Sequence, residues 1–414
     1  PRILGLGEVM DAVSVVEGSV SMNEKLSLFQ NRVRDGHAPF LSKGDLSAYA
    51  LAGISTDHEC VTYEYAMEEC RNGMQVLIRE GSAARNLDAI VKGIVEHHTD
   101  TESFCFCTDD KHIEEIRKDG HINYNVKRAV RLGLSLSSAL KMATIQAARC
   151  YGLKNIGAIA PGYQADFVVL DNKEDLNVVD VYYKGKRIVP DEKPEIKPCP
   201  PVLKNTVHLA KIQEEDFHLS HTGEKAHVII MEEGQITTKD SYEEVPWKEE
   251  NGEKIFAPDS EYQKIAVLER HKNTGKIGLG IIKGFHLSGG AIASSVSHDS
   301  HNIIVVGDND RDMLLAVQEL VRTQGGYTLV ENGEVYRTLP LPVMGLMSDA
   351  GYEKVNESLG DMIPKAHEMG IPTGFDPFIT LSFMALPVIP EIRITPRGIY
   401  LVKEDRMLRG PFEN

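Results

Sequence analysis

The sequence predicts an α/β protein in three parts: βα units of a parallel sheet or barrel, a small all-β segment, and an α+β C-terminal domain. Short β-rich runs alternate with helical stretches over about the first 150 residues, whereas strand-like and helical runs mix after the middle of the chain. With 414 residues, 42% of them hydrophobic, the chain can bury more than one core. We expect the parts to cover residues 1–157, 158–200 and 201–414.

Five β-rich runs in the first part end in polar or ionisable residues. Because the C-terminal ends of parallel strands meet at one edge, side chains that are distant in sequence converge there. Helical spacing of apolar residues predicts helices over Ala83–His98 and Ser135–Tyr151. The five runs are Ile3–Met10, Val33–Ala38, Gly53–His58, Met74–Glu80 and Ser103–Asp109.

The second part begins with a Pro-Gly turn, Pro161–Gly162, which leads into a predicted strand at Phe167–Leu170, with further strands over Val178–Ile188. Asp191–Pro201 is rich in Pro, Lys and Glu without periodicity and is typical of a linker. The C-terminal part has strand-like runs at Ala226–Met231, Lys264–Glu269, Ile277–Ile282 and Ile303–Val306, and helical runs at Asp310–Thr323 and Tyr352–Met369.

Composition excludes several kinds of partner. A net charge of −16 would repel phosphate backbones and anionic headgroups, so we expect neither polymeric nucleic acid nor a membrane surface as a partner. No apolar run approaches the roughly 20 residues needed to cross a bilayer, and no signal sequence opens the chain. Six cysteines, several of them in apolar segments, fit a reducing compartment, so we expect a cytoplasmic protein.

Four residues at the ends of the β-rich runs suggest a metal site: Glu8, His37, His58 and Asp109. Imidazole and carboxylate together suit divalent metals such as Zn, Mn, Fe or Co. Any one of the four alone is better explained as a hydrogen-bonded histidine or a helix-capping carboxylate. Their recurrence at equivalent ends of βα units favours a shared metal centre.

The strand-end segments resemble those of the adenine deaminases, which are metal-dependent hydrolases of the amidohydrolase superfamily. The resemblance covers nearly the whole chain, so a chance match of short motifs does not explain it. The segments are Gly5–Met10, Asp35–Pro39, Ser55–Glu59, Ile78–Asn86, Cys107–Asp110, Ala160–Asp166 and Ser297–Ile303.

The resemblance implies a TIM-like (β/α)8 metallo-hydrolase barrel of which strands four to eight are present, then part of a small β-sandwich and the family's α+β C-terminal domain. Glu8, His37, His58 and Asp109 would then be ligands of a binuclear Mn2+ or Fe2+ site. The His-x-His pair of a first barrel strand is absent, so we expect the N-terminal part to be missing and favour a fragment of a working enzyme over a non-catalytic truncated remnant. The family also leads us to expect a homo-oligomer.

The function implied is hydrolytic deamination of adenine to hypoxanthine and ammonia, in purine salvage, by a metal-activated hydroxide. Such a reaction needs a carboxylate that takes the hydroxide proton and returns it to the leaving amine, and Asp109 is placed for this role. Glu59 either contacts a ring nitrogen or holds His58 in position. Arg79, Glu80, Ser82 and Asp110 are candidates to line the purine site.

Two alternatives remain open at this point. The metal ligands alone would also serve another deaminase or a cyclic amidase of the same superfamily. In the C-terminal domain, His298, Asp299 and His301 form a further polar cluster, which we interpret as a loop with either a structural or a substrate-covering role.

Overall fold

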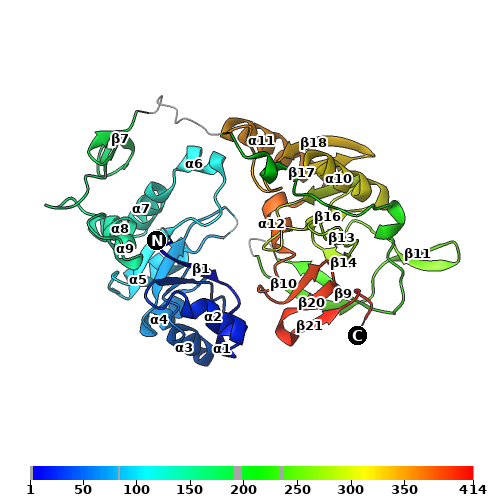
Figure 1. The fold of residues 1–414 in the computed structure, drawn as a ribbon, viewed down its shortest axis with the longest axis horizontal. Coiled ribbons are helices and arrows are strands. Elements are labelled where there is room, and N and C mark those ends of the chain that lie inside the picture. The colour runs from blue at the N-terminus through cyan, green and yellow to red at the C-terminus, as the bar shows by residue number, and fades with distance from the viewer. Residues whose placement is uncertain (1–2, 83, 190–197, 233–235, 414) are drawn as a thin grey trace. The chain divides into compact units, whose positions relative to one another are not determined.

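The computed structural model describes residues 3–82, 84–189, 198–232 and 236–413. The chain divides into two compact units, Pro1–Ile196 and Lys197–Asn414. Figure 1 labels the helices and strands of each unit, and both units mix helices with sheets.

The first unit contains five short parallel strands, and each of them lies within one of the five β-rich runs, so these strand predictions are confirmed. β1 pairs with β2 in one sheet, and β3, β4 and β5 form a second sheet, with every pairing parallel. The strands are β1 (Gly5–Val9), β2 (Val33–Gly36), β3 (Thr56–Asp57), β4 (Gln75–Arg79) and β5 (Phe104–Cys107).

Helices connect consecutive strands of this unit, as βα units require. Several begin at a hydroxyl cap: the side chains of Ser42 and Thr62 accept hydrogen bonds from backbone N–H groups at the starts of α3 and α4. The helices are α1 (Ala12–Val16), α2 (Val20–Ser27), α3 (Lys43–Leu51), α4 (Tyr63–Arg71), α5 (Leu87–Glu96), α6 (Ile113–Asp119), α7 (Ile122–Arg131), α8 (Leu136–Ala143) and α9 (Ile145–Cys150).

Two helix predictions need correction. The helix expected over Ala83–His98 begins only at Leu87. Ala83, where the expected helix starts, lies outside the described part of the chain. The helix expected over Ser135–Tyr151 is two helices, α8 and α9, separated at Thr144, whose φ of −133° and ψ of −94° are not helical. The Thr144 hydroxyl donates to the carbonyl of Leu140, a backbone contact that bends helices, and the apolar periodicity continues across the break.

The parallel strands of the first unit contribute to two hydrophobic clusters. Val76 and Ile78 of β4 pack with α5 in one hydrophobic cluster, while Val9 at the end of β1 packs with α1, α2 and α3 in another. Packing in these clusters holds the strand ends in place and so helps to determine where their terminal side chains lie.

The small β segment is a three-stranded antiparallel sheet of β6 (Phe167–Leu170), β7 (Val178–Tyr183) and β8 (Lys186–Arg187), as its sequence predicts. Most of the predicted linker, Asp191–Pro201, lies outside the described residues, because the structure describes none of residues 190–197.

The second unit is built on an eight-stranded sheet with the order β10-β9-β14-β13-β16-β15-β17-β18. The sequence predicts β9, β13, β14 and β16 and misses the other four. The strands are β9 (Ala226–Met231), β10 (Thr238–Glu243), β13 (Tyr262–Leu268), β14 (Ile277–Lys283), β15 (Gly290–Ser294), β16 (Ile303–Gly307), β17 (Gly326–Glu331) and β18 (Glu334–Pro340).

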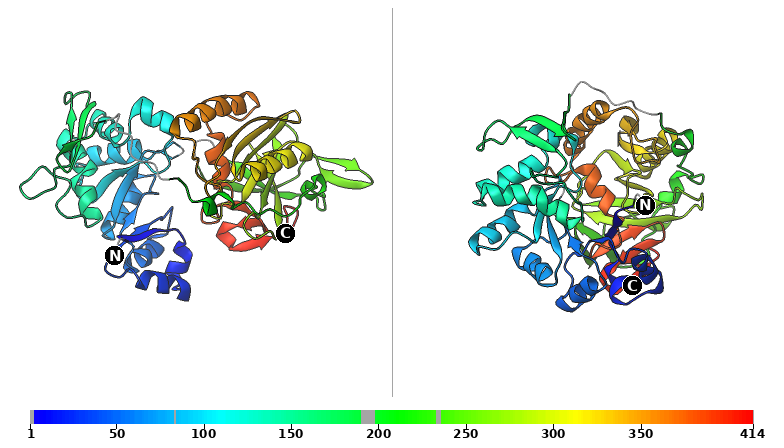
Figure 2. Two further views of the ribbon diagram at one scale, coloured as in Figure 1. Left: turned by 45° about the horizontal axis from the view of Figure 1, so that its top comes forward. Right: turned by 60° about the vertical axis from the view of Figure 1, so that its left-hand side comes forward.

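Helices cover both faces of this sheet. α10 (Asp310–Thr323) packs with Ala293 and Val305, whereas α11 (Tyr352–Glu368) and α12 (Pro377–Phe383) pack with the alternate residues Ile292 and Ile304. Figure 2 shows α10, in yellow, lying across the sheet. A hairpin of β11 (Trp247–Glu250) and β12 (Glu253–Phe256) and a small sheet of β19 (Ile392–Thr395), β20 (Gly398–Leu401) and β21 (Arg406–Leu408) complete the unit. Among the described helices, none is both long and apolar enough to cross a membrane.

Candidate metal centre at the strand ends

The C-terminal ends of the parallel strands carry the ionisable residues that the sequence singles out. Glu8 lies near the end of β1, His37 directly follows β2, and His58 directly follows β3. Arg79 is the last residue of β4, and Asp109 lies two residues beyond β5. The parallel pairing within each sheet turns these ends the same way.

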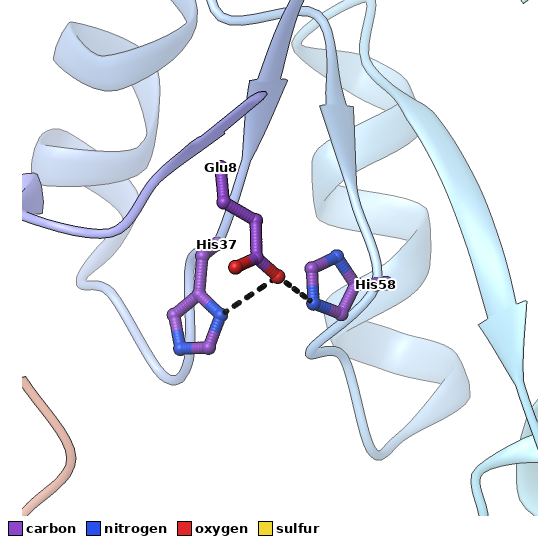
Figure 3. Close-up of side chains that lie close together, drawn as sticks. All are labelled: Glu8, His37 and His58. Carbon is purple, nitrogen blue, oxygen red and sulfur yellow. Dashed lines mark ion pairs between the residues drawn. The ribbon is translucent and has the colours of Figure 1, made fainter. Parts of the chain in front are cut away.

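Glu8, His37 and His58 form a compact group. One ligand atom from each lies within 4.8 Å of the other two. The Glu8 Oε1 atom is 2.9 Å from Nε2 of His58 and 4.0 Å from Nδ1 of His37, and Figure 3 shows the carboxylate between the two imidazoles.

The His37 ring indicates what this group binds. The residue is only 4% exposed, yet neither ring nitrogen has a hydrogen-bond partner among the described residues. A buried polar atom without a partner is costly, so a native structure that keeps one calls for an explanation such as an ion. Two imidazoles and a carboxylate suit divalent transition metals, and the residues present therefore fit a metal.

A second group shares His58 with the first. One ligand atom each from His58, Glu59 and Asp109 lies within 4.8 Å of the others. The Glu59 Oε1 atom is 3.5 Å from Nε2 of His58 and 3.7 Å from Nδ1 of His37. The four ligands expected from sequence are therefore distributed over two adjoining groups joined by one histidine, with Glu59 in the second.

Arg79 holds two carboxylates of this site. Its guanidinium forms a short ion pair with Glu59, with a second contact of 3.2 Å between Nη2 and Glu59 Oε2, and its Nη1 is 2.8 Å from Oδ2 of Asp109. Arg79 is 3% exposed, whereas the Asp109 side chain is 35% exposed. The arginine therefore lies beneath the carboxylates, and the Asp109 carboxylate reaches solvent.

The charges of the site reinforce one another. The hydrogen bond from His58 lowers the pKa of Glu8. Burial lowers the pKa of His58, but the hydrogen bond to Glu8 and the charges of Asp57 and Glu59 outweigh it and raise the pKa to about 9. Burial raises the pKa of Asp109, but Arg79 opposes it and keeps that pKa below its ordinary value. Glu8 and Asp109 are thus held as carboxylates at neutral pH.

The other predicted site residues lie around β4 and β5. Glu80 is buried, and burial raises its pKa. The Ser82 hydroxyl donates to Glu115 and accepts from the backbone of His112, so it holds the chain that follows β5. Asp110 is exposed beside Asp109.

The His298, Asp299 and His301 cluster lies in the second unit, between β15 and β16. The His301 carbonyl accepts a hydrogen bond from Nε of Arg270, and the carbonyl of Ser300 contacts Nε2 of His271. These contacts support the structural interpretation of this loop, and the substrate-covering interpretation stays a prediction.

Sequence reasoning missed the residues that lie behind the ligands. The Tyr49 hydroxyl accepts from the backbone N–H of His37 and donates to the carbonyl of Val9. The Asp57 carboxylate accepts from three backbone N–H groups around the histidines. The sequence does place Asp57 directly before His58, but an acid before a histidine does not reveal its partners.

Comparisons with known proteins identify the family of this chain. Residues 235–406 match the model of the adenine deaminase C-terminal domain, and residues 89–188 match that of the amidohydrolase family. The chain is 55% identical over 409 residues to an adenine deaminase of Desulfitobacterium hafniense, a match that covers 99% of this chain and 71% of that protein. It is 42% identical over 416 residues to an adenine deaminase of Clostridium acetobutylicum, covering 98% of this chain and 72% of that protein. The chain belongs to the adenine deaminase family.

Proposed function

We propose that the protein hydrolyses adenine to hypoxanthine and ammonia, breaking the bond between C6 and its amino nitrogen. The observation that carries the proposal is the convergence of Glu8, His37, His58 and Asp109 at the ends of parallel strands in a chain of this family. The chemistry consumes one water per adenine and needs no redox cofactor.

The residues that would hold the metal are Glu8, His37, His58 and Asp109, and the metal that we propose is Mn2+ or Fe2+ in a binuclear site. A divalent cation bound there would supply a water acidified enough to act as a nucleophile at neutral pH. His58 is the residue common to both groups.

Asp109 is the proposed proton carrier. Its carboxylate takes the proton that the attacking water loses and then gives that proton to the departing C6 amino nitrogen, which leaves as ammonia. The lowered pKa of Asp109 keeps the carboxylate able to accept a proton at the start of each turnover, and its partial exposure places it where a substrate can enter.

Glu59 and Arg79 are proposed to prepare this step. Arg79 binds both Glu59 and Asp109, so it fixes the spacing between the proton carrier and the second carboxylate. Glu59 either contacts a ring nitrogen of the purine or holds His58, as the sequence suggests. We propose Glu80 and Asp110 as further residues that line the purine site, and the contacts of Ser82 with Glu115 and His112 favour a structural part for its hydroxyl.

The test is ammonia release by the purified full-length protein with Mn2+ or Fe2+ supplied and with chelator as control. The substrates are adenine, adenosine, guanine and cytosine, and ring opening of a cyclic amide such as dihydrouracil, which releases no ammonia, is followed separately through its loss of ultraviolet absorbance. We expect ammonia only from adenine and only with metal. Turnover of another base or opening of the cyclic amide would assign the site to a different reaction of the superfamily, and no turnover of any of them would leave a non-catalytic protein. Cytoplasmic residence and self-association remain predictions from the sequence.

A further inference from the structure

A buried carboxylate lies behind the two histidines. Asp57 is the last residue of β3 and is 0% exposed. Its Oδ1 atom accepts the backbone N–H of Ala38 at 2.6 Å, and its Oδ2 atom accepts those of Glu59 at 2.7 Å and Cys60 at 3.0 Å. One side chain therefore satisfies three backbone donors from two different strand ends.

The bonded segments are those that carry the histidines. Ala38 directly follows His37, and Glu59 and Cys60 directly follow His58. Hydrogen bonds to a charged acceptor are stronger and more directional than bonds between neutral groups. Displacing the Asp57 carboxylate would therefore move both histidine segments together.

Among the described residues, no backbone hydrogen bond joins the segment after His37 to the segment after His58. Among the described strands, no ladder of pairing joins β2 to β3, which belong to separate sheets. The backbone bond from Ser55 to the carbonyl of Arg34, at 3.0 Å, lies before the histidines. Beyond it, side chains replace the missing rungs: Thr56 Oγ1 accepts the N–H of Gly36 at 3.1 Å, and then Asp57 accepts that of Ala38.

Asp57 also lies near Cys60 and Glu69, with one ligand atom of each within 4.8 Å of the others. The Asp57 carboxylate already accepts three backbone N–H groups, so few of its lone pairs remain to bind a cation. Burial, followed by the charge of Asp57, raises the pKa of Glu69 to about 11, so Glu69 is a neutral acid beside the Asp57 carboxylate. This cluster is a buried pair of acids that supports the site.

Building on the proposed function, we infer that Asp57 is a positioning residue that sets the two histidine segments in register, so that His37 and His58 present their nitrogens to one metal centre. It touches neither substrate nor metal in this arrangement. Its effect is transmitted through the peptides that follow each histidine.

Asp57→Asn tests the inference, because it keeps the size of the side chain and replaces one acceptor oxygen by a donor. We expect the amide oxygen to keep the two bonds to Glu59 and Cys60 and the NH2 group to face the N–H of Ala38. The His37 segment should then shift. Removing support behind metal ligands typically weakens metal affinity or activity about 10- to 100-fold, so we expect both metal affinity and kcat to fall within that range while KM for adenine changes less than about threefold.

Asp308→Asn is the matched control. Asp308 in the second unit accepts backbone N–H bonds from Gly289 at 2.6 Å and Gly290 at 3.1 Å, so the same substitution removes a similar bond away from the histidines. It should lower the unfolding temperature about as much as Asp57→Asn and leave metal affinity and kcat at the wild-type level. Equal effects of the two variants on metal affinity and kcat would reduce Asp57 to an ordinary structural residue.

A measurement on the unsubstituted, metal-free protein makes the test independent of whether Asp57→Asn folds. Hydrogen-exchange mass spectrometry should find slow exchange in peptides spanning residues 37–41 and 58–62, and faster exchange of the 37–41 peptide in Asp57→Asn but not in Asp308→Asn. Fast exchange of both peptides in the unsubstituted protein would overturn the inference. Because exchange and metal affinity are measured without substrate, they decide the role of Asp57 even if adenine is not deaminated.

Discussion

Two buried arginines show how differently the two units use the same side chain. Arg79 at the end of β4 is 3% exposed and binds the carboxylates of Glu59 and Asp109. Arg270 in the second unit is 1% exposed and donates to backbone carbonyls only, those of His301, Thr206 and Met344.

Their ionisation follows the partners. Burial lowers the pKa of Arg270 to about 10, because no carboxylate compensates for lost hydration. Burial acts on Arg79 in the same direction, but Glu59 and Asp109 outweigh it and raise its pKa. A buried arginine that forms ion pairs with carboxylates indicates a site where those carboxylates are held in place. A buried arginine that donates to backbone carbonyls joins segments of the chain.

The largest effect is expected when the exposed partner of Arg79 loses its charge. Asp109→Asn cannot carry a proton, so kcat should fall about 10³-fold, within the range for lost acid–base catalysis. Steady-state ammonia release and metal analysis check this, and some metal should stay bound through Glu8, His37 and His58. Full activity in Asp109→Asn would sink the proton-carrier role.

Replacing Arg79 itself should lower kcat less than Asp109→Asn does, because the carboxylates of Glu59 and Asp109 remain. Arg79→Met leaves Glu59 and Asp109 without their shared cation, and we expect kcat to drop about 100-fold, since misplaced catalytic groups cost that order of rate. Arg79→Lys should recover only part of the rate, since an ammonium cannot bind two carboxylates as a planar guanidinium does.

Arg128→Met is the control for this pair. Arg128 binds Asp88 in a more exposed ion pair of the same unit, so its loss should leave kcat unchanged. If Arg79→Met behaved like Arg128→Met, the ion pairs of Arg79 would have no part in catalysis.

Arg270→Met tests the arginine of the second unit, which donates only to backbone carbonyls. Three carbonyls in part-buried hydrogen bonds lose their donor at once, and we expect the second unit to lose about 3 kcal/mol of stability. Chemical denaturation followed through Trp247, the one tryptophan, which lies in β11, reports on that unit. An unchanged unfolding midpoint would mean that other donors replace the guanidinium.

The smallest effect concerns the buried acid behind the histidines. The folded-state pKa of Glu69, about 11, lies above its ordinary value of 4.5, so the folded state binds this proton more tightly than the unfolded chain. Stability should therefore fall as pH rises between those two values. Glu69→Gln does not titrate, and its unfolding temperature should fall less than that of the wild type between pH 6 and 9. Parallel curves for the two proteins would show that Glu69 does not ionise differently on folding.

Local sequence patterns predicted much of this molecule. Alternation and apolar runs located β9 and α10, with bounds identical to those observed, and the five strands of the first unit. The candidate ligands could be chosen because each follows a β-rich run, and Glu8, His37 and His58 do meet. Assignment of their roles remains a proposal.

What the sequence did not reveal depends on partners far along the chain. β10 and β18 are polar edge strands whose pairing is set by the sheet that they join. The break between α8 and α9 depends on the hydrogen bond of the Thr144 hydroxyl to the carbonyl of Leu140. The role of Asp57 rests on backbone donors as far away as Ala38, which no residue pattern encodes. Local periodicity specifies elements, and side-chain bonds to distant backbone specify how their ends meet.

The boundary between the two small sheets of the first unit runs through the candidate metal centre. Glu8 lies in β1 and His37 follows β2 of the same sheet, whereas His58 follows β3 of the other. A cation held by all three is then a cross-link between two separately paired sheets. The free energy of metal binding adds to the stability of the fold. Loss of the metal would therefore destabilise the first unit as well as abolish its activity.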